Sequence, residues 1–249
     1  MRDRILEMVK KQFEKDYNCT GEDFNSRTTT ITNLKSIKGS RVYSKEEEIL
    51  KILIFNGKAI ISTQKMLKDW CKSYLSKIPP EWMFLSSVLR RIDHKLNEYG
   101  YEIDDAHHFY LPKNNFIKSI DNTNLKWYEK EDIQQFRGDS RFDEAFAFND
   151  LFIDILAVAS FDEKGNINGM AGATEDSDLM WQIGINVFPG SEGKGIGTKL
   201  VTLLKDEIIR RGKVPFYGTA ESHMISQKVA IASGFEPSFA ELKVKRKYK

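Results

Sequence analysis

The stretch of sequence that decides the fold is MWQIGINVFPGSEGKGIGTKLV, residues 180–201. Its first eight residues are mostly apolar, and Pro189-Gly190 then interrupts any regular element. Glycines follow at every second position, 193, 195 and 197, and an amphipathic helix is predicted from about residue 197 to residue 211. A glycine-rich loop that opens a helix exposes consecutive main-chain N–H groups at the positive end of the helix dipole. The stretch therefore predicts a strand, a phosphate-binding loop and a helix.

Composition and charge exclude several classes of protein. The 249 residues suffice for one large domain or two small ones, and 38 Lys and Arg against 36 Asp and Glu leave a formal net charge of +2. This balance gives no reason to expect a nucleic-acid partner. The two cysteines, Cys19 and Cys71, lack the spacing of a zinc site or a disulfide framework, so no metal is expected.

The chain also lacks the features of a membrane protein. No run of residues approaches the roughly 20 apolar residues that a spanning helix needs. The first residues, MRDRILEMVKKQF, mix charged with apolar side chains, which is not typical of a signal peptide. We therefore expect a cytoplasmic protein with no membrane partner.

The first half of the chain predicts a mixture of helices and strands. Asn56-Gly57 stands between two mainly apolar runs, 48–55 and 58–63, as in a tight hairpin. Apolar residues at helical spacing predict one helix before the hairpin and two after it, and residues 106–112 predict a short strand.

A polar segment, residues 113–124, is the predicted boundary between two domains. We expect an N-terminal α/β domain at residues 1–120 and a second domain at residues 121–249. Small residues in the predicted strand 167–174, INGMAGAT, would let another group approach its backbone closely. The predicted elements of the second domain are, in order, a polar helix at 132–141, strands at 154–161, 167–174 and 180–187, the helix at 197–211, a strand at 214–219, a helix at 226–232 and a strand at 239–244.

The spacing of the glycines separates the kinds of phosphate-binding loop. A P-loop needs Gly-Lys followed by Ser or Thr, and here Lys194 precedes Gly195. A dinucleotide-binding fingerprint needs GxGxxG after the first strand of a βαβ unit, whereas GxGxG follows an antiparallel hairpin here. Neither pattern fits, so a nucleotide-binding protein is the least favoured of the alternatives.

A third pattern fits. Residues 187–200, VFPGSEGKGIGTKL, resemble the pyrophosphate loop of the GNAT superfamily of acetyl-coenzyme A-dependent N-acyltransferases. Residues 216–235, FYGTAESHMISQKVAIASGF, are similar to that family's second signature, a strand followed by a helix that ends in Gly-Phe. The resemblance covers roughly residues 151–239, in the order found in the family.

The resemblance implies a fold, a ligand and an activity. The fold would be α/β (α+β), a mixed, mostly antiparallel sheet flanked by helices, and the sheet would splay beside residues 185–187 to admit acetyl-CoA. Residues 1–120 would be an additional α/β domain that binds the acceptor, or a degenerate second copy. The residues implied to bind acetyl-CoA are Ile185, Asn186, Val187, Glu192, Gly193, Lys194, Gly195, Ile196, Gly197, Thr198, His223 and Ser226.

An amine would attack the thioester carbonyl directly, which calls for a base and an acid. Ser226 matches a position where some members use serine as the acid, although serine is also a favoured helix N-cap. His223 is a candidate because imidazole titrates near neutral pH, and a hydrogen-bonding role is equally open. Asp178 and Glu221, at the ends of predicted strands, are candidate bases, and solvated strand ends would explain them as well.

The chain departs from the family pattern at three positions. Glu192 stands where Gln or Arg is usual, and His223 stands where an asparagine often contacts the cofactor. Ala230 replaces a tyrosine that protonates the leaving thiolate in many members. We therefore expect an N-acetyltransferase that acts on a primary amine of a small molecule or peptide, and the alternative is a non-catalytic module that senses acyl-CoA.

Overall fold

The computed structural model describes residues 2–26, 28–113 and 123–247, and the chain divides into two compact units. The N-terminal unit comprises residues 7–109 and 238–249, and the C-terminal unit comprises residues 1–6 and 110–237. The predicted boundary segment lies mostly outside the described residues, so a division at residue 120 stays a prediction. The compact units instead divide the chain at 109/110 and again at 237/238.

The N-terminal unit contains the predicted hairpin. Strands β2 (Leu50–Phe55) and β3 (Lys58–Thr63) pair antiparallel, and Asn56 and Gly57 have the positive φ angles, 49° and 70°, of a two-residue turn. The sequence prediction is confirmed here. Strand β1 (Thr30–Asn33) pairs parallel to β3.

The last strand of the chain joins the same sheet. Strand β10 (Phe235–Arg246) pairs antiparallel to β2 through residues 239–242. The predicted strand at 239–244 is therefore confirmed, and this pairing explains why residues 238–249 group with the N-terminal unit. Strand β4 (Tyr101–Pro112) is longer than the predicted strand at 106–112.

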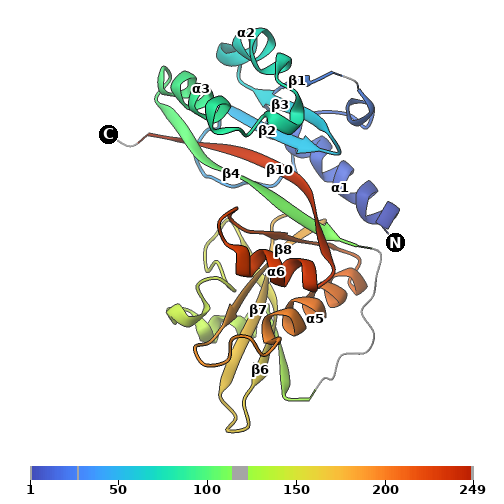
Figure 1. Ribbon diagram of the computed structural model, residues 1–249, viewed down its shortest axis with the longest axis vertical. Helices are drawn as coiled ribbons and strands as arrows, with labels where there is room; N and C mark the ends of the chain where they lie inside the picture. The colour runs from blue at the N-terminus through green and yellow to red at the C-terminus, as the bar shows by residue number, and fades with distance from the viewer. Residues whose placement is uncertain (1, 27, 114–122, 248–249) are drawn as a thin grey trace. The chain divides into compact units, whose positions relative to one another are not determined.

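Two helices cover a face of this sheet, as Figure 1 shows. They are α2 (Lys65–Ser73) and α3 (Ser86–Asn97), at the predicted places. Their apolar stripes pack against strand side chains in one core that excludes water. The helix residues in this core are Leu67, Cys71, Val88, Ile92 and Leu96, and the strand residues include Ile52, Ile61 and Leu242.

A buried ionic cluster joins the first helix, a loop and the last strand of the N-terminal unit. The side chain of Arg41 has no exposed surface, and its Nε lies 2.6 Å from Asp16 Oδ2 in α1 (Arg2–Tyr17). Arg41 Nη2 lies 2.6 Å from Glu241 Oε1, to which Tyr17 also donates a hydrogen bond of 2.7 Å. Burial opposes ionisation of Glu241, but the charge of Arg41 prevails, and the pKa of Glu241 is lowered.

The C-terminal unit contains the predicted strands of the second half. Strands β5 (Leu125–Glu129), β6 (Ile153–Phe161), β7 (Ile167–Glu175) and β8 (Met180–Val187) pair antiparallel in this order, and β9 (Val214–Gly218) pairs parallel to β8. The predicted mixed, mostly antiparallel sheet is confirmed.

Helices α5 (Ile196–Arg210) and α6 (Met224–Ala232) flank this sheet (Figure 1). Because side chains alternate along a strand, Val158 and Ala171 pack with Leu200 and Leu204 of α5, whereas Ala157 and Met170 belong to a separate core. Among the helices of the described ranges, none is both long and apolar enough to cross a membrane.

The predicted polar helix at 132–141 is wrong. Helix α4 (Lys130–Ile133) is short and continues as 3₁₀ turns at 134–136 and 140–142. Gly138, with φ of 84°, ends the first turn, and Phe136 and Phe142 point into the core. The aromatic side chains decide the path of this segment.

We expect Glu241→Gln to lower the free energy of unfolding by about 3–5 kcal/mol, because it removes one of the two carboxylates that pair with the buried charge of Arg41. Urea denaturation measures the loss. Glu102→Gln is the control, since Glu102 pairs with Lys245 and Lys247 at 4.0 and 3.9 Å on the surface, where an ion pair contributes at most about 1 kcal/mol. Equal losses in the two variants would contradict the role given to the cluster.

Candidate functional site

The loop between β8 and α5 has the backbone that its glycines permit. Gly190, Gly193 and Gly195 have φ angles of 82°, 73° and 77°, a region that other L-residues rarely adopt. Gly195 directly precedes α5 and no side chain caps the helix. Gly197 lies inside the first turn of α5 and is buried. A Cβ added there would lie 3.3 Å from Val187 Cγ2, so the position has little room for a side chain.

The main-chain N–H groups of residues 193–198 have no hydrogen-bond acceptor among the described residues. The first N–H groups of a helix cannot bond within it, and here neither a side chain nor the loop replaces the missing acceptors. They lie at the positive end of a 15-residue helix. This arrangement suits an anion with several oxygens, such as a diphosphate.

Glu192 is engaged within this loop. Its Oε2 accepts a hydrogen bond of 2.7 Å from the N–H of Gly190, and Lys194 Nζ donates one of 2.9 Å to the carbonyl of Gly190. Glu192, which stands where the family carries Gln or Arg, is therefore bonded to Gly190 at the start of the loop. Lys194 is bonded to the same glycine.

A cavity of about 750 Å³ lies beside the loop in the C-terminal unit. The parallel pairing of β8 with β9 ends at Ile183 and Tyr217, and beyond that point residues of both strands line the cavity. The predicted splay of the sheet beside residues 185–187 is present. The predicted cofactor-binding residues that line the cavity are Ile185, Asn186, Val187, Glu192, His223 and Ser226.

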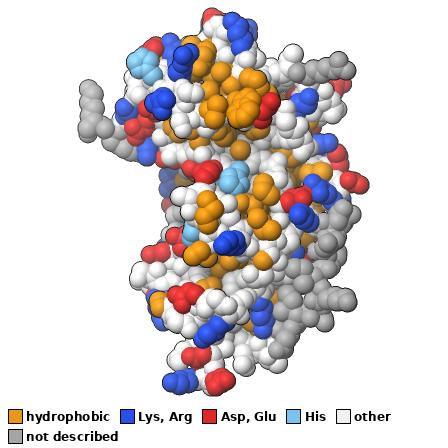
Figure 2. Space-filling view, viewed as in Figure 1, with side chains coloured by type: hydrophobic (Ala, Val, Ile, Leu, Met, Phe, Trp, Pro, Cys, Tyr) orange, Lys and Arg blue, Asp and Glu red, His pale blue; other side chains and the backbone are white. Residues whose placement is uncertain are grey.

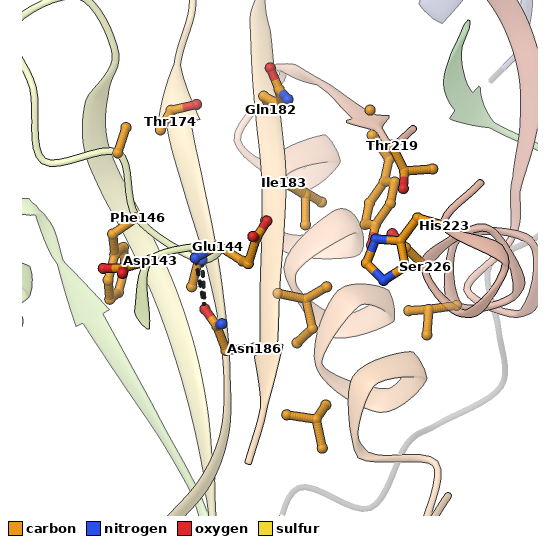
Figure 3. A pocket seen from close by; sticks show the side chains of 18 of the residues that line it. Asp143, Glu144, Phe146, Thr174, Gln182, Ile183, Asn186, Thr219, His223 and Ser226 are labelled. Carbon is orange, nitrogen blue, oxygen red and sulfur yellow. Dashed lines mark hydrogen bonds between the residues drawn. The ribbon is translucent and has the colours of Figure 1, made fainter. Parts of the chain in front are cut away.

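A pair of glycines lies under a segment that lines the cavity. Gly172 of β7 and Gly184 of β8 are direct neighbours in the sheet, and the segment 143–147 crosses them (Figure 3). A Cβ on Gly184 would lie 1.9 Å from the carbonyl oxygen of Glu144, and one on Gly172 would lie 2.1 Å from that of Ala145. The close approach that the small residues of the strand predict is confirmed, and the approaching group is the chain's own backbone.

Two side chains fix this segment at both ends. Asn186 Oδ1 accepts the N–H groups of Glu144 and Ala145 at 3.2 and 2.7 Å. Asp154 accepts those of Ala147 and Phe148 at 2.9 and 2.8 Å. Burial raises the pKa of Asp154 although these bonds favour its ionised form. The side chain of Asn186 therefore positions the wall of the cavity.

A hydrogen-bonded pair of hydroxyls lies on the opposite wall. Tyr217 Oη and Ser226 Oγ are 2.8 Å apart, and either can be the donor. Burial raises the pKa of Tyr217, the bond with Ser226 lowers it, and the charge of Glu144 adds to the rise. Figure 3 shows Glu144 over β8, with His223 and Ser226 across the cavity from it.

The predicted base candidates Asp178 and Glu221 are not among the residues that line the cavity. Asp178 is exposed before β8 begins, and at about 3.3 Å per residue it lies roughly 23 Å along the strand from Ile185. Glu221 is exposed between β9 and α6. Ala230 is fully buried in the core with Leu200 and Phe235, so the place of the family's tyrosine does not face the cavity here.

Two further carboxylates line the cavity, Asp143 and Glu144. No sequence motif singles them out, because they lie in an irregular segment far from the glycine loop. The only signal in the sequence is indirect: the small residues of β7 and β8 mark where another segment crosses the sheet. Within the described ranges, no group of three or more His, Cys, Asp or Glu side chains could hold a metal ion.

The mouth of the cavity has an apolar side. Figure 2 shows hydrophobic side chains gathered over α6, where Met224, Ile225 and Ile231 are 56%, 74% and 54% exposed. Ile225 also lines the cavity, together with Phe146 and Phe152. A ligand at this end would meet both apolar side chains and carboxylates.

Comparison with known proteins agrees with this geometry. Residues 121–235 match the sequence model of the Acetyltransferase (GNAT) family. No curated protein matches the chain.

Solved structures have similar folds. A GCN5-related N-acetyltransferase-like protein from Streptococcus suis is 12% identical, with 99% of this chain and 100% of that chain covered and a TM-score of 0.52. A GNAT-family acetyltransferase from Colwellia psychrerythraea is 12% identical, with coverages of 99% and 97% and a TM-score of 0.47. A Salmonella typhimurium protein with its cofactor acetyl-CoA is 18% identical, with coverages of 49% and 92% and a TM-score of 0.34. The first similarity shows a shared fold, and identities this low carry no conclusion about substrates.

We expect Asn186→Ala to release the segment 143–147 from β8, because both hydrogen bonds to Glu144 and Ala145 are lost. Amide hydrogen exchange measures the effect. The loss of two bonds at about 1 kcal/mol each predicts exchange at the Glu144 amide faster by roughly tenfold or more. The Ala145 amide keeps a bond of 3.0 Å to the carbonyl of Phe142 and should change less. The amides of Ala147 and Phe148, held by Asp154, are the internal control, and unchanged exchange at Glu144 would contradict the tether.

Proposed function

Because residues 121–235 belong to the GNAT family of acetyltransferases, we propose that the protein transfers an acetyl group from acetyl-CoA to an amine. The observation that carries this proposal is the set of main-chain N–H groups without acceptors at residues 193–198, beside a cavity where β8 and β9 separate. The first feature suits the diphosphate of coenzyme A, and the second suits its thioester arm.

The binding site follows from these two features. The N–H groups of residues 193–198 would hold the diphosphate, with Lys194 as the nearest added positive charge. The backbone of Ile185, Asn186 and Val187 lies beyond the last pairing with β9, so it is available to pair with the amide groups of the pantetheine arm. The match of residues 121–235 to the model of the Acetyltransferase (GNAT) family supports this choice of ligand.

The reaction needs no covalent enzyme intermediate. The amine nitrogen attacks the thioester carbonyl carbon, a C–N bond forms, the C–S bond breaks, and the thiolate takes a proton. We assign this proton to Ser226, whose oxygen in turn accepts the hydrogen bond of Tyr217. Burial keeps the Tyr217 hydroxyl protonated, so this pair replaces the tyrosine that is absent at Ala230.

His223 lines the cavity, as Ser226 does, and in this proposal it would hydrogen-bond the thioester arm. Asp178 and Glu221 receive no step, because neither lines the cavity.

One other function has an observation in its favour. The alternative is a module that binds acyl-CoA without turnover. Glu192 puts a carboxylate at the start of the phosphate loop, and Ala230 stands where many members of the family have the tyrosine that protonates the thiolate. Release of free thiol from acetyl-CoA across a panel of amines distinguishes the two. Binding without thiol release for every amine would favour the sensor and contradict the transferase.

We expect Gly195→Val to weaken acetyl-CoA binding at least tenfold, because valine does not adopt a φ of 77° and the loop must change its path. Isothermal titration calorimetry measures the dissociation constant. Gly165→Val is the matched control: Gly165 has a φ of 81° and open space around it, as Gly195 has, but lies in the β6–β7 hairpin. If both variants bound acetyl-CoA like the unaltered protein, the loop would not be the anchor.

We expect Ser226→Ala to lower kcat by roughly a hundredfold, the usual size of an acid's contribution, with little change in acetyl-CoA affinity. Tyr217→Phe should lower kcat as well, and the double variant should be no slower than Ser226→Ala, because the two hydroxyls act as one donor. Thiol-release kinetics measure all three. Additive losses would show that the two hydroxyls act separately.

A further inference from the structure

The backbone of Glu144 is held at the cavity by strand β8. Its backbone lies against Gly184, one residue beyond the last residue of β8 that pairs with β9. Its N–H is bonded to Asn186, and the next residue is bonded there too. These contacts fix the Cα of Glu144 at the point where β8 and β9 separate.

The side chain extends toward the reacting end of the cavity. Figure 3 shows the Glu144 carboxylate over β8 and facing the wall that carries His223 and Ser226. The charge of Glu144 acts on the Tyr217 hydroxyl, which places the carboxylate within electrostatic reach of the hydroxyl pair. Both groups therefore border the same space.

The charges around this space favour a protonated amine. The described residues that line the cavity include the carboxylates of Asp143, Glu144 and Glu192 and neither lysine nor arginine. Glu192 is bonded to Gly190 in the phosphate loop, and Asp143 precedes Glu144 on the same segment. The other titratable groups that face Glu144 are Tyr217 from β9 and His223 before α6.

We propose that Glu144 is the catalytic base, which takes a proton from the acceptor's ammonium group. This inference rests on the proposed acetyl transfer. An N–H bond of the ammonium breaks, its proton moves to a carboxylate oxygen of Glu144, and the freed electron pair on nitrogen attacks the thioester carbonyl. Ser226 protonates the departing thiolate. The second proton that the nitrogen loses as the amide forms passes through solvent to restore the Ser226 hydroxyl, and Glu144 returns its own proton to solvent. Proton transfer at the two walls thus remains balanced.

The test is the pH dependence of Glu144→Gln, with the alkylamine that the unaltered protein turns over fastest in the panel. Glutamine keeps the shape of the side chain and the backbone bonds to Asn186, but it cannot take the proton. At pH 7 kcat should fall roughly a hundredfold. The defect should shrink about tenfold for each pH unit toward the pKa of the amine, because solvent then supplies free amine. Glu163→Gln, on the exposed β6–β7 hairpin, is the control and should match the unaltered protein.

A purely structural role would give a defect of the same size at every pH, and this result would overturn the inference, as would normal turnover by Glu144→Gln. Calorimetry separates this failure from a failure of the proposed function, because Glu144→Gln should bind acetyl-CoA within about twofold of the unaltered protein. If the unaltered protein bound acetyl-CoA but released no thiol with any amine, the proposed transfer would be contradicted and this inference with it. Partial recovery of kcat in Glu144→Asp would support the base.

Discussion

The unsatisfied N–H groups at the start of α5 are the constraint on which the site depends. No side chain caps this helix start, and glycines with positive φ lead into it. The glycines turn the backbone so that residues 193–198 present donors without acceptors. The loop lacks these internal hydrogen bonds, and the proposed anionic ligand would supply them. Because β8 leads directly into this loop, the anchor and the opened edge of the sheet lie on one continuous segment.

A second constraint builds the opposite wall. Gly172 and Gly184 are neighbours across β7 and β8, and any side chain at either position would overlap the backbone of residues 144 and 145. The absence of two Cβ atoms therefore allows an irregular segment to rest on the sheet, where Asn186 bonds it. Strand β8 thus has an edge that does not pair with β9 beyond Ile183, and it supplies both the glycine under the crossing segment and the side chain that bonds it. The side chains of Asp143 and Glu144 on that segment are therefore positioned by backbone contacts rather than by a helix or strand.

The sequence predicted what depends on local patterns. The hairpin at Asn56-Gly57 and the strand, loop and helix of residues 180–210 follow from turn chemistry and apolar periodicity, which act over a few residues. The polar segment 132–141 was mispredicted as one helix because buried aromatics override its local pattern. The cluster of Asp16, Arg41 and Glu241 could not be predicted, since its members come from distant parts of the chain. The same holds for Glu144, whose place is set by glycines that come 28 and 40 residues later.

The central claim is that main-chain N–H groups at the start of α5 hold a diphosphate. The most direct measurement is an NMR titration of the ¹⁵N-labelled protein with acetyl-CoA, followed at the backbone amides. The account predicts that amides of residues 193–198 show the largest shifts, and that coenzyme A, which keeps the diphosphate, reproduces them. Unmoved amides at 193–198 under saturating acetyl-CoA, with shifts only elsewhere in the chain, would contradict it.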